Sequence, residues 1–404
     1  MINACVIGLG QRGAFLVEKV LLKSNDIKIV SVCDIYEDRI KNAVDLVKGV
    51  YEEPKGFTDY KEALNVKGID AVFIYTGWER HAEIALYAME KGIAVASEVG
   101  SEYSLDACFN LVKTQERTKT PYMLLENCCW GDSELLALNM ARKGLFGTIV
   151  HCSGAYAHDL REEIAYGKQN RHYRFDNYLK YNKENYPTHE LGPIAKVLDL
   201  NRGNRILTVS SFASKAVGLK EYIESRPDAT EEMKNANFLQ GDIVTTVLTC
   251  ENGETIMLRL DTTLPRSYDR DFTLRGTKGS FYQSTNSVYF DGEKEYWSNA
   301  YYLKHHLNNA NEYKDKYLPD IWKNVTPEEK QAGHGGMDYF CTKAFVDALK
   351  TGAPMPVDVY DSALWQAVGV LSEKSIKEGG MPQAMPDFTN GEYKTRKRLD
   401  VCPL

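Results

Sequence analysis

Three glycines near the start of the chain have the spacing of a phosphate-binding turn. The motif directly follows an apolar run, Ala4–Ile7, and reads Gly8-Leu9-Gly10-Gln11-Arg12-Gly13. The first glycine permits a tight turn, the second lets the backbone approach a pyrophosphate, and the third lets a helix pack closely on the strand. A helix that begins here would present free N–H groups and the positive end of its dipole to an anion. The pattern predicts a dinucleotide site.

An acidic residue at the end of the next apolar run indicates which dinucleotide is bound. Asp34 lies 21 residues after Gly13, and a carboxylate at this distance accepts hydrogen bonds from a ribose diol and repels a 2′-phosphate. We therefore expect NAD rather than NADP, although Arg12 and Arg39 are cations that could bind the 2′-phosphate of NADP. The alternative is an ordinary glycine turn in an α/β domain with Asp34 as a cap, which the order and spacing of the motif disfavour.

The first third of the chain alternates short apolar runs with helical periodicity. The expected strands are Ile2–Ile7, Ile27–Cys33, Ala71–Thr76, Ile93–Ser97 and Tyr122–Leu125, and the expected helices are Ala14–Leu22, Arg39–Lys48, His81–Lys91 and Leu105–Arg117. The runs show no polar alternation, as in strands buried on both faces. Alternating strands and helices predict a parallel sheet with right-handed crossovers, which is a Rossmann domain at residues 1–125.

The pattern changes after about residue 145. Strand-like segments now follow one another with short turns, at Thr148–Tyr156, Ile206–Phe212, Ile243–Cys250, Thr255–Thr262, Asp271–Arg275 and Ser287–Phe290. Such a succession favours an open, mostly antiparallel sheet. Helices are expected at Leu191–Leu200, Met337–Leu349 and Ser362–Ile376. We expect an α/β fold with a substrate and oligomerisation domain at residues 126–404, whose C-terminal helices are free to pack back on the Rossmann domain.

Composition excludes several classes of protein. The 404 residues are 43% hydrophobic and carry a net charge of −7, which argues against a disordered chain and against binding of nucleic acid or of an anionic membrane. No apolar run has the length of a membrane span, and the first residues do not predict a secretory signal. Nine cysteines without a CxxC pair predict reduced thiols and a cytoplasmic protein. No zinc framework is present in the sequence, so no metal is expected.

Two further segments resemble the Gfo/Idh/MocA oxidoreductase family. They are Thr76-Gly77-Trp78-Glu79-Arg80-His81 and Glu98-Val99-Gly100. The resemblance implies a dinucleotide domain followed by an open, mostly antiparallel sheet, with cofactor contacts from Thr76, Trp78, His81 and Glu98. The family's dehydrogenases carry Lys where this chain has Val99, and that Lys is tied to proton transfer. A simple sugar or inositol dehydrogenase is therefore disfavoured.

Four longer blocks resemble the NAD-dependent glycosidases of glycoside hydrolase family 109. They begin at Leu125, Tyr186, Asp261 and Gly333 and read LENCCWG, YPTHELGP, DTTLPRSY and GHGGMD. With the glycine motif, the resemblance covers almost the whole chain. The founding activity of that family is removal of α-linked N-acetylgalactosamine. The implied reaction oxidises C3 of the sugar, eliminates the aglycone across C1 and C2, adds water and reduces C3 again, so that NAD is regenerated.

The resemblance also implies which side chains carry the reaction. Its motifs place Tyr156, His189, Tyr268 and Glu126 in catalytic roles, with His189 near C3 and Tyr156 or Tyr268 at C2 and C1. His334 and Asp338 are expected to line the same pocket and bind substrate. Imidazole and phenol groups suit proton transfer at neutral pH. A small carbohydrate is the expected substrate, and a homo-oligomer, dimer or tetramer, is the expected assembly.

Each of these residues also has a plainer interpretation. Tyr156 could simply pack in a strand, Thr188 could be a helix N-cap with His189 behind it, and Cys128 and Cys129 are expected to be packing residues. Tyr268 could be an exposed turn residue, Glu126 a strand cap and His334 a flexible loop residue. Two other functions remain open, a sugar or glycoside 3-dehydrogenase that releases NADH and a cofactor-bound sensor that has lost catalysis.

Overall fold

The chain divides into two compact units. The computed structural model describes residues 1–100, 102–293 and 299–404. Unit 1 contains Met1–Trp130 and Val325–Gln366, and unit 2 contains Gly131–Asn324 and Ala367–Leu404. The helix α17 (Val359–Lys377) runs through the boundary between them. Each unit is described by itself.

Unit 1 is built on a parallel sheet with the strand order β3-β2-β1-β4-β5-β6. The strands are β1 (Ile2–Ile7), β2 (Ile27–Cys33), β3 (Lys55–Phe57), β4 (Ala71–Ile74), β5 (Ala94–Ser97) and β6 (Tyr122–Leu124). Every residue of β4, β5 and β6 is buried, as expected for a sheet covered on both faces. The predicted Rossmann fold is confirmed. The sequence missed β3 because it is short, largely exposed and centred on a glycine.

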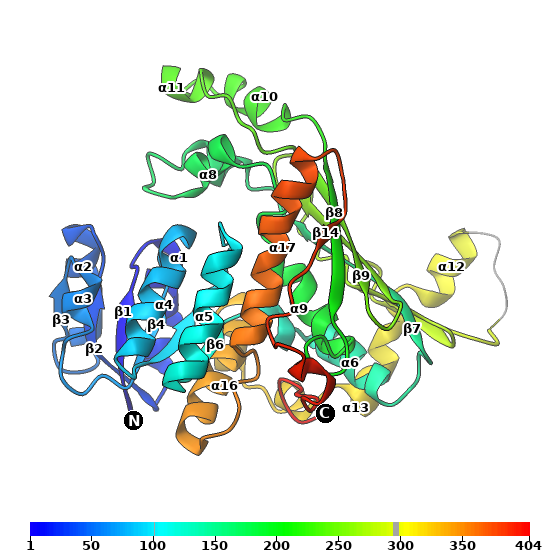
Figure 1. Ribbon diagram of the computed structural model, residues 1–404, viewed down its shortest axis with the longest axis horizontal. Helices are drawn as coiled ribbons and strands as arrows, with labels where there is room; N and C mark the ends of the chain where they lie inside the picture. The colour runs from blue at the N-terminus through cyan, green and yellow to red at the C-terminus, as the bar shows by residue number, and fades with distance from the viewer. Residues whose placement is uncertain (101, 294–298) are drawn as a thin grey trace. The chain divides into compact units, whose positions relative to one another are not determined.

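Helices connect these strands in the expected alternation, drawn from blue to cyan in Figure 1. They are α1 (Gln11–Lys19), α2 (Glu37–Lys48), α3 (Tyr60–Ala63), α4 (His81–Glu90) and α5 (Leu105–Thr118). Two later helices, α15 (Pro327–Gln331) and α16 (Met337–Thr351), belong to the same unit. The first helix begins at Gln11, three residues earlier than the sequence predicts, so that the third glycine of the motif lies inside it.

Unit 2 is built on a mixed sheet with the order β13-β12-β11-β7-β10-β9-β8-β14. The strands are β7 (Ile149–Ala157), β8 (Ile206–Ala213), β9 (Ile243–Cys250), β10 (Thr255–Asp261), β11 (Thr273–Gly276), β12 (Gly279–Tyr282), β13 (Ser287–Phe290) and β14 (Gln383–Ala384). The predicted antiparallel character holds except between β7 and β10, which are parallel with Tyr156 opposite Leu260. The carboxyl ends of two central strands therefore meet at one edge of the sheet. The short strands β12 and β14 were not predicted.

Helices of unit 2 pack on this sheet and extend beyond it. They are α6 (Asp132–Arg142), α7 (Arg161–Ala165), α8 (Arg174–Lys180), α9 (Thr188–Val197), α10 (Gly218–Glu224), α11 (Glu231–Lys234), α12 (Asn299–His306), α13 (Lys314–Tyr317) and α14 (Asp320–Lys323). Where α9 crosses β7, a Cβ on Gly154 would lie 3.1 Å from the Glu190 carbonyl oxygen. The alternative interpretation of Thr188 as a helix N-cap does not hold. Pro187 has that position, and among the described residues the buried Thr188 Oγ1 has no hydrogen-bond partner.

Candidate active site

The turn between β1 and α1 can be built only from glycine at two of its positions. Gly8 has a φ of +95°, and a Cβ there would lie 2.5 Å from the Thr76 backbone nitrogen. A Cβ on Gly13 would lie 2.0 Å from the Gly8 carbonyl oxygen. The N-cap of α1 is Gly10, which provides no side-chain cap, so the first N–H groups of the helix are available to an anion. This cradle fits the pyrophosphate of a dinucleotide.

Asp34 lies beside the glycine turn at the end of β2. Its Oδ2 accepts the Leu9 N–H at 2.7 Å and its Oδ1 accepts the Tyr36 N–H at 3.0 Å. The side chain of Arg39 reaches Asp34 Oδ2 at 3.7 Å and stacks over the Tyr36 ring. Each carboxylate oxygen keeps a second lone pair, so Asp34 can still accept hydrogen bonds from a ribose diol. The residues present fit NAD.

Arg12 binds two carboxylates of the protein, so its guanidinium is not available to a phosphate. Its Nε donates to Glu98 Oε2 at 2.8 Å, and its two terminal nitrogens donate to the two Asp338 oxygens, each at 2.8 Å. Asn127 Nδ2 also donates to Asp338, at 2.6 Å. Burial alone would raise the pKa of Asp338, but the hydrogen bonds from Arg12 hold it well below its ordinary value. The Arg12 guanidinium and the Asp338 carboxylate therefore remain ionised, and Glu98 joins them in one hydrogen-bonded network.

The loop before α16 has a strained backbone that brings His334 to this network. Residues 333–336 all have positive φ angles, between 42° and 107°, and His334 is the one residue among them that is not glycine. Left-handed backbone costs little for glycine and more for other residues. His334 Nδ1 lies 2.8 Å from Asp338 Oδ2, and about half of its side chain is exposed. Asp338 itself is buried, and its carboxylate binds Arg12, Asn127 and His334.

The segment after β4 and the segment after β5 contact each other closely. A Cβ on Gly100 would lie 3.0 Å from His81 Nδ1 and 3.1 Å from Trp78 Cδ1. His81 Nε2 lies 2.9 Å from the Thr76 carbonyl oxygen, and burial lowers the pKa of this histidine, so the imidazole is neutral at neutral pH. Glu98 Oε1 accepts the Val99 N–H at 2.9 Å. These segments follow the carboxyl ends of β4 and β5, where ligands of open α/β sheets bind.

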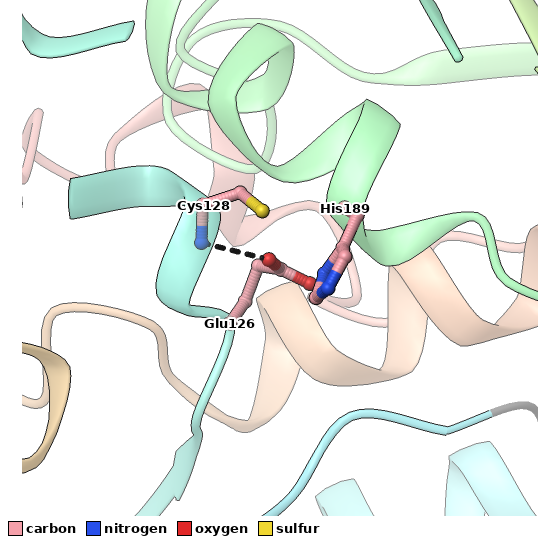
Figure 2. Close-up of side chains that lie close together, drawn as sticks. All are labelled: Glu126, Cys128 and His189. Atoms are coloured by element: carbon pink, nitrogen blue, oxygen red, sulfur yellow. Dashed lines mark hydrogen bonds between the residues drawn. The ribbon is translucent and has the colours of Figure 1, made fainter. Parts of the chain in front are cut away.

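Glu126 follows the last strand of the same sheet. Its side chain is fully buried, and Figure 2 shows its Oε1 accepting the Cys128 N–H, at 3.0 Å. Cys128 and Cys129 are buried, as their expected packing role requires. Glu126 therefore has the position of a strand-end carboxylate.

Unit 2 gathers a cluster of aromatic rings where β7 ends and α9 begins. The ring centroids of Tyr156 and Tyr186 are 4.3 Å apart, those of Tyr186 and His189 are 4.8 Å apart, and those of Tyr156 and His189 are 5.5 Å apart. Tyr156 and Tyr186 are buried and His189 is half-buried. The structure therefore brings Tyr156 together with His189, as the sequence motifs suggest.

Arg174, on α8, places a positive charge on this cluster. Its guanidinium lies 5.3 Å from the centre of the Tyr186 ring, and its Nε lies 2.8 Å from Glu163 Oε1. Burial raises the pKa of Tyr156 to about 12, while the charge of Arg174 and its hydrogen bond lower it. The Tyr156 phenol thus keeps its proton at neutral pH, and the guanidinium stabilises the phenolate when the proton leaves.

Tyr268 joins the cluster through a second histidine. The ring of His158 is 5.1 Å from that of Tyr268 and 6.0 Å from that of Tyr156. Arg270 donates to the Tyr268 hydroxyl at 3.3 Å, and Tyr268 is 47% exposed. Tyr268 therefore marks the solvent side of the cluster.

Sequence reasoning did not select three members of this cluster, Tyr186, Arg174 and His158. Tyr186 lies three residues before His189 in the same motif, just outside the helix that begins at Thr188. Its place in that motif could have identified Tyr186. Arg174 and His158 lie in a long polar and aromatic stretch without a recognisable pattern.

Comparison with known proteins assigns a family to these features. Residues 2–125 match the oxidoreductase family with a NAD-binding Rossmann fold, and residues 130–395 match the C-terminal domain of glycosyl hydrolase 109. This chain belongs to glycosyl hydrolase family 109. A family member from Stenotrophomonas maltophilia is 39% identical over 98% of this chain and 91% of its own length. The α-N-acetylgalactosaminidase of Tannerella forsythia is 33% identical over 98% of this chain and 88% of its own.

Solved structures confirm the fold of this family 109 member. Levoglucosan dehydrogenase in complex with NADH and levoglucosan has a TM-score of 0.69 at 17% identity, over 95% of this chain and 99% of the other. A myo-inositol 2-dehydrogenase from Lactobacillus plantarum has a TM-score of 0.67 at 15% identity, over 95% and 99%. The chain is an enzyme, a glycosidase with NAD as its cofactor, as the sequence predicts. Within the described ranges, no helix is long and apolar enough to cross a bilayer.

Proposed function

We propose that this enzyme hydrolyses α-linked N-acetylgalactosaminides by transient oxidation of the sugar at C3. Two relatives that carry the name α-N-acetylgalactosaminidase, from Tannerella forsythia and Shewanella oneidensis, are 33% and 34% identical over 98% of this chain. These relatives support the choice of sugar. The cluster of Tyr156, Tyr186 and His189 beside Arg174 is the observation that carries the proposal, because phenols and imidazole move protons without forming a glycosyl ester.

The reaction begins at C3 of the sugar. Bound NAD supplies the acceptor for the C3 hydride in the first half of the cycle and its donor in the second. His189 takes the proton of the C3 hydroxyl, since imidazole accepts and returns protons near neutral pH. The C3 ketone that results makes the neighbouring C2–H bond acidic. In unit 1, the glycine turn and Asp34 hold the cofactor, with contacts from Thr76, Trp78, His81 and Glu98.

Elimination and hydration follow at C2 and C1. We assign removal of the C2 proton and protonation of the departing aglycone oxygen to Tyr156 and Tyr268. The Arg174 guanidinium steadies the Tyr156 phenolate, and exposed Tyr268 is suited to a leaving group of varied size. Removal of the C2 proton expels the aglycone from C1, and water then adds to the enone at C1 while C2 regains a proton. Return of hydride and proton to C3 completes a hydrolysis without net oxidation.

Three further residues keep their proposed roles. Glu126 is proposed to contribute its buried carboxylate to the reaction. His334, whose side chain is half exposed, is proposed to contact the sugar. Asp338 is proposed to line the same pocket as His334 and bind substrate there, and its carboxylate already contacts Arg12 and the His334 ring.

A panel of nitrophenyl glycosides in deuterated water tests this function. We expect release of nitrophenol from the α-N-acetylgalactosaminide, deuterium at C2 of the released sugar and no accumulation of NADH. Stoichiometric NADH without release of sugar would instead identify a 3-dehydrogenase. The buried Val99, at the position where dehydrogenases of the wider family carry Lys, disfavours that outcome.

A further inference from the structure

A buried ion pair contacts the hydroxyl of Tyr268. It joins Glu134, on α6, whose side chain is 2% exposed, to Arg270, whose side chain is 12% exposed. Neither residue has a role in the proposed reaction. A buried ion pair adds little stability compared with apolar side chains of the same volume, because both charges lose their hydration. The position of this pair beside the aromatic cluster therefore needs a reason other than stability.

Contacts from two elements fix the guanidinium of Arg270. Its Nε donates to Glu134 Oε1 at 2.7 Å, and its Nη2 lies 2.6 Å from the same oxygen. The Gln283 side chain, directly after β12, also donates to that oxygen, at 2.6 Å, and the Gln283 backbone N–H donates to the Phe272 carbonyl oxygen at 3.0 Å. The orientation of the guanidinium is therefore set by α6 and by the end of β12.

The remaining terminal nitrogen of Arg270 determines the direction of the hydrogen bond to Tyr268. Arg270 Nη1 donates to the Tyr268 hydroxyl oxygen at 3.3 Å. A guanidinium has no acceptor and keeps its proton, so the phenol oxygen can only accept in this contact. The O–H proton of Tyr268 is therefore directed away from Arg270. Because about half of Tyr268 is exposed, that proton can be donated to a ligand.

The backbone that carries Tyr268 and Arg270 is paired with the strand that carries Tyr156. The Asp269 N–H donates to the Ala157 carbonyl oxygen at 2.9 Å, and the Arg270 carbonyl oxygen accepts an N–H of the same strand, β7. These bonds fix the main chain next to Tyr268, and the Arg270 side chain fixes the phenol oxygen. Both ends of the Tyr268 side chain are thus positioned relative to the aromatic cluster.

We propose that Arg270, held in place by Glu134, orients the Tyr268 hydroxyl to donate its proton to the aglycone oxygen. Arg270 and Glu134 are positioning residues, since they act through Tyr268. The inference rests on the proposed function, and it deepens that function by assigning Tyr268 to the leaving group.

The proton transfer is balanced within the elimination and the hydration. As the C1–O bond breaks, its electron pair stays on the aglycone oxygen and takes the Tyr268 proton, while the C2–H electron pair forms the C1–C2 double bond. The O–H electron pair remains on the Tyr268 phenolate, which the charged hydrogen bond from Arg270 stabilises. The water that adds to C1 then returns a proton to this phenolate.

The acidity of the aglycone tests this assignment. A nitrophenol leaves readily as an anion, whereas methanol must be protonated, so only the methyl glycoside depends on an oriented acid. Replacing Arg270 alone would leave the Glu134 charge buried and unpaired, so the test variant combines Glu134→Gln with Arg270→Gln. We expect kcat to fall about 100-fold on the methyl α-N-acetylgalactosaminide and to stay within about 3-fold on the nitrophenyl glycoside.

A second ion pair in the same unit provides the matched control. Arg205 Nε donates to Glu251 Oε2 at 2.9 Å, and the Tyr393 hydroxyl binds the same carboxylate. The combination of Arg205→Gln with Glu251→Gln removes a comparable pair near a tyrosine outside the aromatic cluster. It should change kcat by less than about 3-fold on either glycoside, because a partly exposed pair contributes little.

Adding Tyr268→Phe shows whether the ion pair acts through Tyr268. Residues that act as a unit have non-additive effects. Once Tyr268→Phe is present, the substitutions at Glu134 and Arg270 should lower kcat on the methyl glycoside by less than about 3-fold further. Losses that multiply, or equal losses on the two glycosides, would overturn the proposal and leave the pair as a structural contact between α6 and the sheet.

Nuclear magnetic resonance tests the contact independently of turnover. The holoprotein is labelled with ¹³C at Cζ of tyrosine, and the Tyr268 signal is the one that Tyr268→Phe removes. This signal should move in the variant at Glu134 and Arg270 and stay in place in the control at Arg205 and Glu251. An unmoved signal would overturn the proposal. If the signal moves and the wild type cleaves no glycoside, the proposed function fails while the positioning contact stands.

Discussion

Replacement of Asp338 by asparagine is expected to destabilise unit 1 by about 3 kcal/mol. The Asp338 side chain is 2% exposed, and its two oxygens bind both terminal nitrogens of Arg12. In Asp338→Asn one of these oxygens becomes an amide nitrogen, which cannot accept from Arg12, and the charge of Arg12 loses a partner. Breaking a buried pair costs about 3–5 kcal/mol, and the lower value applies because the Arg12 side chain is 31% exposed.

Thermal unfolding at several pH values measures this cost. For a unit of this size, a loss of 3 kcal/mol lowers Tm by about 6–12 °C. The pKa of Asp338 is lowered in the folded state, so its stabilising effect is present above the ordinary value of about 4 and is lost as the pH falls further. The difference in Tm between Asp338→Asn and the wild type should therefore be largest near neutral pH and become smaller in strong acid.

A second aspartate on the same helix provides the matched control. Asp347 pairs with Lys343 one turn away, and its side chain is 49% exposed. Because exposed pairs contribute little, Asp347→Asn should change stability by less than about 1 kcal/mol. Equal effects of Asp338→Asn and Asp347→Asn would refute the reasoning that the Arg12 network is a buried structural tie.

Two more substitutions test the glycine turn of unit 1 and the aromatic cluster of unit 2. Gly13→Ala should abolish retention of NAD, because the new Cβ would lie 2.0 Å from the Gly8 carbonyl oxygen. The assay measures the nicotinamide released when the protein is denatured. The control Gly49→Ala should retain NAD, since the atom closest to its Cβ is 3.4 Å away. Tyr156→Phe should lower kcat by about 10²–10⁴-fold with little change in KM, since it removes a proton-transfer group and little volume. A Tyr156→Phe enzyme with wild-type kcat would remove Tyr156 from the mechanism.

Local patterns predicted those parts of the fold that depend on local physics. The apolar runs of unit 1 predicted five of its strands because most of their residues are apolar and buried. The short strand β3 failed this test, since two of its three residues are exposed. In unit 2, the parallel pairing of β7 with β10 could not be inferred, because the sequence between them holds helices, loops and two other strands.

The aromatic cluster shows the same limit at the level of single side chains. His189 and Tyr156 were accessible through motifs, and Tyr186 through its place in the same motif as His189. Arg174 was not, because an arginine in a polar helix usually faces solvent, and only the tertiary structure buries it against Tyr186. The burial of Glu184 and Glu190 was hidden for a related reason. Glutamates are ordinarily exposed, and nothing in the local sequence indicates that these two are buried.

Arg12 shows how a distant partner reverses an inference from local sequence. Beside a glycine motif, an arginine suggests affinity for a phosphate and weakens the expectation of NAD over NADP. Its partner Asp338 lies 326 positions later in the chain, in a helix that belongs to the same compact unit. Because Arg12 is bound by Asp338 and Glu98, and Arg39 approaches Asp34, neither cation is left to recruit a 2′-phosphate. The selectivity for the ribose thus rests with the carboxylate of Asp34, which repels a phosphate at that position.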